Sequence, residues 1–274
     1  MKKITKVGNV NIGNDKDFVL IAGPCVIEND LSITFNTAEK LKEITTKHNI
    51  PLIFKSSFDK ANRTSIDSFR GPGLESSISI FEELKKKFNL PLLTDIHEIN
   101  QIEPISKFVD ILQIPAFLSR QTDIIVAAAK SGLPLNIKKG QFLSPHQIIK
   151  SADKAIKSGC ENICITERGF SFGYGNLVSD MRAIPIIQSY SLPVIFDATH
   201  SVQLPGQAGD STSGERQFVK TLALSSVAAG ADGIFIEVHP DPDNAPCDGP
   251  NMLPLDEVEN LLIKCKKIFE TIRE

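Results

Sequence analysis

The chain has 274 residues, of which 41% are hydrophobic and 23% are charged, and its formal net charge is -3. These values are ordinary for a globular protein with a large core, and the length suits one α/β barrel or two smaller domains. The charge argues against a nucleic-acid-binding surface, and no apolar run is long enough to span a bilayer. We therefore expect a cytoplasmic protein that binds neither nucleic acid nor membrane.

The cysteines form an odd and unpatterned set, which argues against a disulfide framework in a chain of this size. Any functional cysteine should therefore act as a thiolate. Cys160 and Cys164 bracket the start of an apolar run and are expected to be small core residues. The five positions are Cys25, Cys160, Cys164, Cys247 and Cys265.

At the N-terminus, "KITKVGNVNIG" predicts a small hairpin. Eight short apolar runs rich in β-branched residues then follow, and such runs are typical of strands buried on both faces of a parallel sheet. The stretches between them have helical spacing, most clearly the last, in which apolar residues from Val258 to Ile272 form one stripe. The eight runs cover residues 18–23, 51–55, 91–95, 109–114, 134–138, 162–166, 193–197 and 233–237.

The connections between these runs differ at their two ends. Four runs are preceded by "NIP", "NLP", "GLP" or "SLP", which stop a helix abruptly. Long polar loops instead follow the second, sixth, seventh and eighth runs, and loops of this length in a compact domain are usually functional. The pattern predicts a single TIM (β/α)8 barrel over residues 1–274, with the hairpin at its bottom and the active site at the C-terminal ends of the strands. A doubly wound open sheet is the alternative.

Closure of the barrel predicts a metal site, because it brings the eighth strand beside the first and the seventh. Cys25, His200, Glu237 and Asp248 would then meet at the barrel mouth. One thiolate, one imidazole and two carboxylates suit one divalent ion, such as zinc, iron(II) or manganese. Cys247 in place of Asp248 is the competing assignment, since neighbours on a loop cannot be ranked from sequence.

Six basic residues follow or end the predicted strands around the same rim. A lysine that ends a buried strand is costly unless it meets an anion, so the set predicts an anionic, phosphorylated ligand. The two groups, near the second strand and near the fifth and sixth, indicate two anionic groups or two substrates. The alternative is that each cation pairs with a carboxylate such as Asp95, Asp197 or Glu167. The six are Lys55, Lys60, Arg63, Arg120, Lys138 and Arg168.

Histidines outside the metal set carry weaker signals. His97 lies two residues past Asp95 at a strand end and is a possible site residue, whereas His48 and His146 lie in helical regions and are expected at the surface. No Ser-His-Asp order or nucleophile elbow is evident, which argues against hydrolysis by acyl transfer.

Motifs along the whole chain resemble those of the 3-deoxy-D-manno-octulosonate 8-phosphate synthases, in the same order. The related 3-deoxy-arabino-heptulosonate 7-phosphate synthases carry a "KPRTS"-like loop where this chain has "KANRTS", so the resemblance favours arabinose 5-phosphate over erythrose 4-phosphate as acceptor. The motifs are "LIAGPCVIE", "FKSSFDKANRTS", "FRGPGLE", "TDIHE", "QIPAFLSRQTD", "NIKKGQFLSP", "TERGFSFGYGNLVSDMR", "FDATHSVQLPG" and "IEVHPDPDNAPCDGPNMLPL".

The resemblance implies an enzyme that condenses phosphoenolpyruvate with arabinose 5-phosphate and water, releasing phosphate, in lipopolysaccharide biosynthesis. Cys rather than Asn at position 25, together with "CDGPNM", implies the metal-dependent type. The implied metal ligands are Cys25, His200, Glu237 and Asp248.

The resemblance also implies roles for substrate-binding residues. Lys138 and Arg168, with Lys55 and Gln141, would hold phosphoenolpyruvate. Lys60, Asn62, Arg63 and Thr64 would bind arabinose 5-phosphate, Ala116 would line the substrate site, and a neighbouring subunit of a homotetramer would supply Arg120. Lys60 and Asp95 join the metal ligands Cys25, His200 and Asp248 as expected catalytic residues, with Asp95 or a metal-held hydroxide managing the proton.

Two other functions compete with this interpretation. The first is a heptulosonate 7-phosphate synthase that acts on erythrose 4-phosphate. The second is a non-catalytic barrel that binds sugar phosphates as a sensor, which would be expected to have lost ligands that are all present in this chain.

Overall fold

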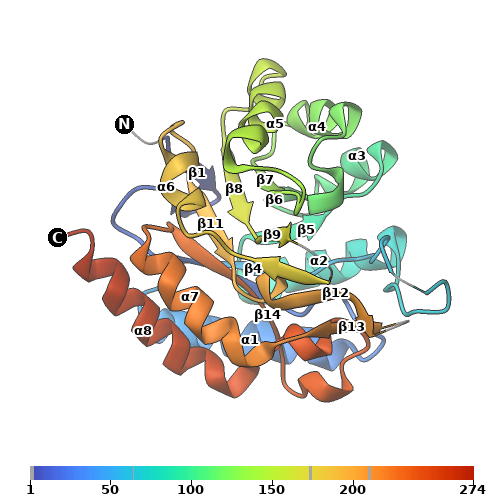
Figure 1. Ribbon diagram of the computed structural model, residues 1–274. Coiled ribbons are helices and arrows are strands. Elements are labelled where there is room, and N and C mark those ends of the chain that lie inside the picture. The colour runs from blue at the N-terminus through green and yellow to red at the C-terminus, as the bar shows by residue number, and fades with distance from the viewer. Residues whose placement is uncertain (1–2, 64, 173–174, 209–210) are drawn as a thin grey trace.

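The computed structural model describes residues 3–63, 65–172, 175–208 and 211–274 (Figure 1). Eight parallel strands pair in chain order, and β14 pairs with both β11 and β3, which closes the ring. The predicted TIM barrel is confirmed, and the open doubly wound sheet is wrong. The strands are β3 (Val19–Gly23), β4 (Leu52–Lys55), β5 (Leu92–Asp95), β6 (Ile111–Ile114), β7 (Leu135–Lys138), β8 (Ile163–Glu167), β11 (Val194–Asp197) and β14 (Gly233–His239).

Helices surround the strands, as Figure 1 shows. Local sequence sets their ends: Ser144 caps α5 by accepting the amide N–H of Gln147, and Pro145 occupies the first turn. Asn89 ends α2 in the left-handed conformation. The helices are α1 (Leu31–Lys47), α2 (Leu74–Phe88), α3 (Ile102–Ile105), α4 (Thr122–Ala129), α5 (Pro145–Lys157), α6 (Ala183–Gln188), α7 (Val219–Ala228) and α8 (Val258–Thr271).

Shorter elements decorate the barrel. The two extra hairpins, β9–β10 and β12–β13, belong to the long connections after β8 and β11, and β15 extends the sheet beside β14. These strands are β9 (Phe170–Phe172), β10 (Asn176–Val178), β12 (Gln203–Ala208), β13 (Ser211–Gly214) and β15 (Leu253–Pro254). The 3-10 helices are η1 (Ile99–Gln101), η2 (Ala116–Leu118), η3 (His200–Val202), η4 (Arg216–Phe218), η5 (Pro242–Asn244), η6 (Gly249–Asn251) and η7 (Leu255–Glu257).

The predicted N-terminal hairpin is confirmed as β1 (Thr5–Val7) and β2 (Val10–Ile12). Its side chains Val7, Val10 and Ile12 form one buried cluster with residues from the barrel interior, including Ile111 and Phe235. The hairpin therefore fills one end of the barrel with apolar side chains. A second, larger cluster lies between the strands and the helices.

The last helix shows how closely the apolar pattern matches the structure. Val258, Leu261 and Leu262 of the predicted stripe are buried in the larger cluster, whereas Ile272 is 42% exposed just beyond the helix end. Among the described residues, none of the helices combines the length and the hydrophobicity that crossing a membrane requires.

Candidate active site

Charged side chains gather where the barrel strands end. Lys55, Asp95, Lys138 and Asp197 are the last residues of β4, β5, β7 and β11, and Glu237 lies near the end of β14. All five are at most 6% exposed. Because parallel strands of a closed barrel end at one face, these groups share one dry and highly charged mouth.

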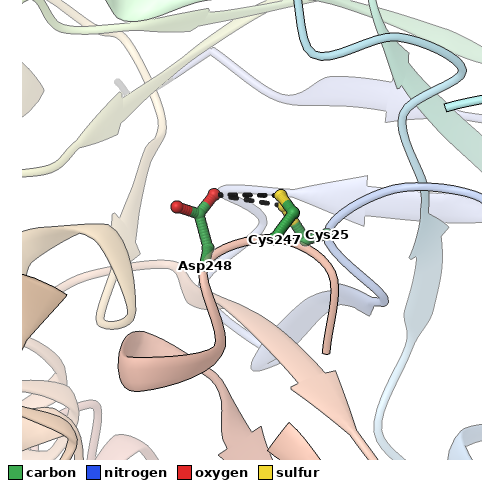
Figure 2. Close-up of side chains that lie close together, drawn as sticks. All are labelled: Cys25, Cys247 and Asp248. Carbon is green, nitrogen blue, oxygen red and sulfur yellow. Dashed lines mark hydrogen bonds between the residues drawn. The ribbon is translucent and has the colours of Figure 1, made fainter. Parts of the chain in front are cut away.

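Two cysteines and an aspartate meet at one side of this mouth (Figure 2). Cys25 Sγ donates to Asp248 Oδ2 at 3.1 Å, and Cys247 Sγ approaches the same oxygen at 3.5 Å. Asp248 has a left-handed backbone, with φ of 51°, just before η6. The loop after β14 thus returns to the loop after β3, as the predicted ring closure requires.

A second trio shares Asp248 with the first. One ligand atom from each of His200, Glu237 and Asp248 lies within 4.8 Å of the others, as do those of Cys25, Cys247 and Asp248. His200 Nε2 is 3.5 Å from Glu237 Oε2. The four predicted ligands therefore fall into two overlapping groups, and Cys247 lies beside them, so the geometry keeps both cysteines as candidate ligands.

The donor set fits a divalent cation of intermediate softness. Thiolate, imidazole and carboxylate are all ligands of zinc and of the neighbouring transition metals. Asp197 orients His200, because Asp197 Oδ2 lies 2.8 Å from the ring Nδ1 and leaves Nε2 to face Glu237. A carboxylate behind a ligating histidine is the usual outer-shell arrangement at metal sites.

Protonation in this region follows from burial and neighbouring charge. Burial, together with the neighbouring Cys247 and Glu237, raises the pKa of Cys25 well above its ordinary value. Burial also raises the pKa of Asp248, but His200, Lys60 and the Cys25 hydrogen bond outweigh it, so the net pKa is lowered. Asp248 is therefore ionised, whereas the Cys25 thiol needs a nearby cation to become a thiolate.

The buried lysines of the mouth pair with carboxylates. Lys55 Nζ donates to Glu237 Oε1 at 2.6 Å and to the Cys25 carbonyl at 2.7 Å. Lys60 Nζ lies 3.6 Å from Glu237 Oε1 and 3.9 Å from Asp95 Oδ2, and Lys138 forms an ion pair with Asp197. These lysines thus have the carboxylate partners that the alternative interpretation expected.

Burial and neighbouring charges shift the pKa values of Lys138 and Lys60 in opposite directions. Burial lowers the pKa of Lys138, whereas for Lys60 the surrounding Cys25, Glu237 and Asp95 outweigh burial and raise the pKa. Lys60 is therefore a firmly protonated ammonium at the centre of the mouth. Lys138 Nζ also lies 3.4 Å from His200 Nδ1, which links the cationic and metal-binding sides.

Arg168 and Gln141 bring unused polar atoms to the region. Arg168 is 4% exposed, and its Nη2 donates to the His200 carbonyl at 2.8 Å and to the Gln203 side chain. Its Nε and the Gln141 Oε1 are buried without a hydrogen-bond partner in the described structure. A buried donor without a partner is costly, so a bound ligand is the natural complement of the Arg168 donor.

A polar ladder inside the barrel was not predicted from the sequence. Asp95 accepts hydrogen bonds from Ser57 and from Gln113, and Asn136 donates to Gln113 Oε1 at 2.8 Å. Thr166 completes the ladder by donating to Asn136 Oδ1 at 2.7 Å. Its only sequence signal is a polar residue in each of four apolar runs, at positions that alternation turns inward.

The other predicted residues lie further out or elsewhere. Arg120 and Asn62 are exposed, Arg63 is half-buried and Ala116 is buried, while Thr64 lies outside the described residues. His97 packs edge-on against Phe58, with ring centroids 6.1 Å apart. His48 pairs with Glu259 at 2.7 Å and His146 approaches Tyr190 at 3.1 Å, on the outer helices.

Fold and site together define a class: a TIM barrel whose mouth can hold a divalent cation beside an anionic ligand. The chain belongs to the DAHP synthetase I family, whose model matches residues 2–274. It is similar to proteins named 2-dehydro-3-deoxyphosphooctonate aldolase. The one from Geotalea uraniireducens is 56% identical over 273 residues and the one from Rickettsia typhi is 52% identical over 274, each match covering 100% of both chains.

Proposed function

We propose that this protein is a metal-dependent 3-deoxy-D-manno-octulosonate 8-phosphate synthase. The observation that carries the proposal is the 52–56% identity, along the full chain, to relatives named 2-dehydro-3-deoxyphosphooctonate aldolase. In the proposed reaction, a carbon–carbon bond forms between C3 of phosphoenolpyruvate and the aldehyde carbon of arabinose 5-phosphate. Water adds at C2 of the phosphoenolpyruvate unit, and phosphate leaves by C–O cleavage.

Phosphoenolpyruvate would be held by Lys138 and Arg168, with Lys55 and Gln141. The support is their burial at one face of the barrel and the unpaired polar atoms of Arg168 and Gln141. Two polyanions must be brought face to face in this reaction, which costs repulsion and orientational entropy. Cations fixed before the substrates arrive offset both costs.

Arabinose 5-phosphate would be bound by the loop after β4. Lys60, Asn62, Arg63 and Thr64 are the proposed contacts, and the buried Ala116 would line the same cavity. The half-buried Arg63 keeps an unpaired Nε, which supports a role in holding an anion. This loop follows β4, whereas Lys138 ends β7 and Arg168 follows β8, and this order around the barrel supports two anion pockets.

Cys25, His200, Glu237 and Asp248 would hold one divalent metal, which is zinc, iron(II) or manganese by donor chemistry. When bound, such an ion supplies a positive charge that can orient or activate water or polarise an aldehyde oxygen. The Asp197 carboxylate fixes the His200 ring, and Lys55 Nζ holds Glu237 Oε1 in place. The chain thereby orients its own ligands before any substrate binds.

Lys60 and Asp95 are the further proposed catalytic residues. The ammonium of Lys60 lies near both Glu237 and Asp95, and it could also donate a hydrogen bond to a negative oxygen that develops on the substrate. Burial raises the pKa of Asp95, but Lys55 and Lys60 outweigh it and keep the pKa well below the ordinary range. Asp95 is therefore an acceptor that holds Lys60 and the polar ladder.

We further propose a cytoplasmic homotetramer. The support for the assembly is that Arg120 and Phe117 are both exposed, as residues that contact a neighbouring subunit would be. The support for the compartment is that all five cysteines are free thiols, two of them at the mouth.

Phosphate release is the decisive measurement. The protein is incubated with phosphoenolpyruvate and either arabinose 5-phosphate or erythrose 4-phosphate, before chelation, after it, and after zinc, iron(II) or manganese is added back. We expect release with arabinose 5-phosphate, lost on chelation and restored by metal. Faster release with erythrose 4-phosphate would support the heptulosonate synthase instead, and no release with any aldose phosphate would favour a sensor.

A further inference from the structure

A second ion pair lies behind the cations of the mouth, between Lys139 and Glu167. Lys139 directly follows β7, and Glu167 is the last residue of β8, so each is next in sequence to a proposed phosphoenolpyruvate contact. Lys139 Nζ lies 3.5 Å from Glu167 Oε1, and the two side chains are 2% and 3% exposed. Successive side chains along extended backbone point to opposite sides, so the pair turns away from Lys138 and Arg168.

Lys139 ties together the two loops that follow β7 and β8. Its Nζ donates to the carbonyl oxygens of Leu143 at 3.0 Å and Gly140 at 3.4 Å, both in its own loop. It also donates to the carbonyl of Gly169 at 3.2 Å, in the next loop. One ammonium thus links the loop that directly follows Lys138 to the loop that carries Arg168.

Glu167 fixes the turn from which Arg168 departs. Its Oε1 accepts the amide N–H groups of Arg168 at 3.0 Å and Gly169 at 2.7 Å. Gly169 has a φ of +88°, a conformation that glycine adopts without strain. The carboxylate therefore holds the backbone of Arg168 itself, from the side opposite to its guanidinium.

Stability alone does not account for this pair. Removing two charges from water is costly, and a buried pair recovers this cost only when its remaining atoms are well hydrogen-bonded. Glu167 Oε2 is buried without a hydrogen-bond partner in the described structure. Burial also lowers the pKa of Lys139 and raises the pKa of Glu167, so the local environment disfavours both charges.

We propose that Lys139 and Glu167 are positioning residues that set the distance and direction of Lys138 and Arg168 for phosphoenolpyruvate. This inference rests on the proposed function. The pair is electrically neutral, so it holds the two loops without cancelling the positive charge that the substrate needs. Neither residue has to touch the substrate to act.

The test replaces both charges with neutral side chains of similar length, in the double variant Lys139→Met with Glu167→Gln. Calorimetry measures phosphoenolpyruvate affinity, and initial rates give KM for each substrate. We expect phosphoenolpyruvate Kd to rise about 10- to 100-fold while KM for arabinose 5-phosphate changes less than about threefold. The unfolding temperature should stay near that of the wild type, because a neutral replacement of a buried ion pair is often tolerated.

A matched control uses the ion pair of Arg273 and Asp232, whose charged atoms are 3.2 Å apart. Asp232 directly precedes β14, at the other end of the barrel, and Arg273 follows α8. The variant Arg273→Met with Asp232→Asn is the same kind of neutral replacement, and it should keep wild-type phosphoenolpyruvate affinity. If the first double variant does not fold, Lys139→Arg is the substitute. Arginine keeps the positive charge but cannot place one ammonium among three carbonyls. It should also weaken the binding of phosphoenolpyruvate more than the binding of arabinose 5-phosphate.

The outcomes separate the two proposals. Wild-type phosphoenolpyruvate affinity in the Lys139 variants, or equal losses for both substrates, would overturn the positioning role while leaving the proposed function intact. A wild-type protein that neither binds phosphoenolpyruvate nor releases phosphate would overturn both.

Discussion

The two ends of the barrel are buried to similar degrees but are built from opposite materials. At the N-terminal end, Val7, Val10 and Ile12 of the hairpin pack against the apolar barrel interior. At the C-terminal end, Lys55, Asp197 and Glu237 are buried as charges and matched by partners. Apolar burial stabilises the N-terminal end, whereas burying charges in fixed places at the C-terminal end costs free energy.

This difference indicates where stability and function reside. Apolar packing needs only the right volume, so the N-terminal end, which the β1–β2 hairpin closes, can stabilise the barrel. We call this the plugged end. A dry cluster of charges gives strong and directional fields, which suit the binding of anions and a metal but are costly to fold. Changes at the mouth should therefore alter chemistry more than stability, and changes at the plug should do the reverse.

Cys25→Asn should have the largest effect at the mouth. It removes the thiolate from the proposed metal site, so we expect the purified variant to hold little metal and its phosphate release to become less dependent on added metal. Elemental analysis and initial rates measure both effects. Cys247→Ala is the matched control and should keep its metal; if Cys247→Ala loses metal while Cys25→Asn retains it, the ligand is Cys247.

Ile12→Ala tests the plugged end. Ile12 is fully buried against the barrel interior, so its truncation should lower the free energy of unfolding by about 3 kcal/mol. Urea unfolding measures the loss, and the KM values for both substrates should remain those of the wild type. A large change in either KM would show that the two ends are coupled, and it would contradict the division of stability and function between them.

Much of this contrast could be predicted from the sequence. The eight apolar runs are recognisable because strands of a closed parallel barrel are buried on both faces. Ring closure then brought Cys25 and His200 to the same mouth as Glu237 without any knowledge of side-chain contacts. The hairpin was predictable because glycines punctuate a short alternating segment.

Other features depend on facing directions that composition does not specify. The sequence "KK" at 138–139 does not say which lysine faces the mouth. In the structure, Lys138 forms an ion pair with Asp197 and Lys139 forms one with Glu167. The ladder from Asp95 through Gln113 and Asn136 needs the register of three neighbouring strands. Asp248 and Cys247 both approach the site, because one sharp turn presents adjacent side chains together.

Arg63→Ala sharpens the contrast within the mouth itself. If the loop after β4 holds the sugar phosphate, KM for arabinose 5-phosphate should rise about 30-fold, or about 2 kcal/mol, while KM for phosphoenolpyruvate stays nearly constant. Initial rates with each substrate varied in turn measure the split. Equal increases in both KM values would contradict two separate anion pockets.

The smallest expected effect lies outside both ends, at the partly exposed cluster of Lys47, His48 and Glu259. These partners, Lys47 first, lower the pKa of Glu259 from 4.5 to about 2. A carboxylate with a lowered folded-state pKa adds stability that is present above its unfolded pKa and lost as pH falls toward 2. Glu259→Gln should therefore flatten the acid side of the stability profile slightly and leave stability near pH 7 almost unchanged, because exposed pairs contribute little. Thermal unfolding across pH 2 to 7 measures the difference, and a variant that matched the wild type throughout would show that solvent screens this pair completely.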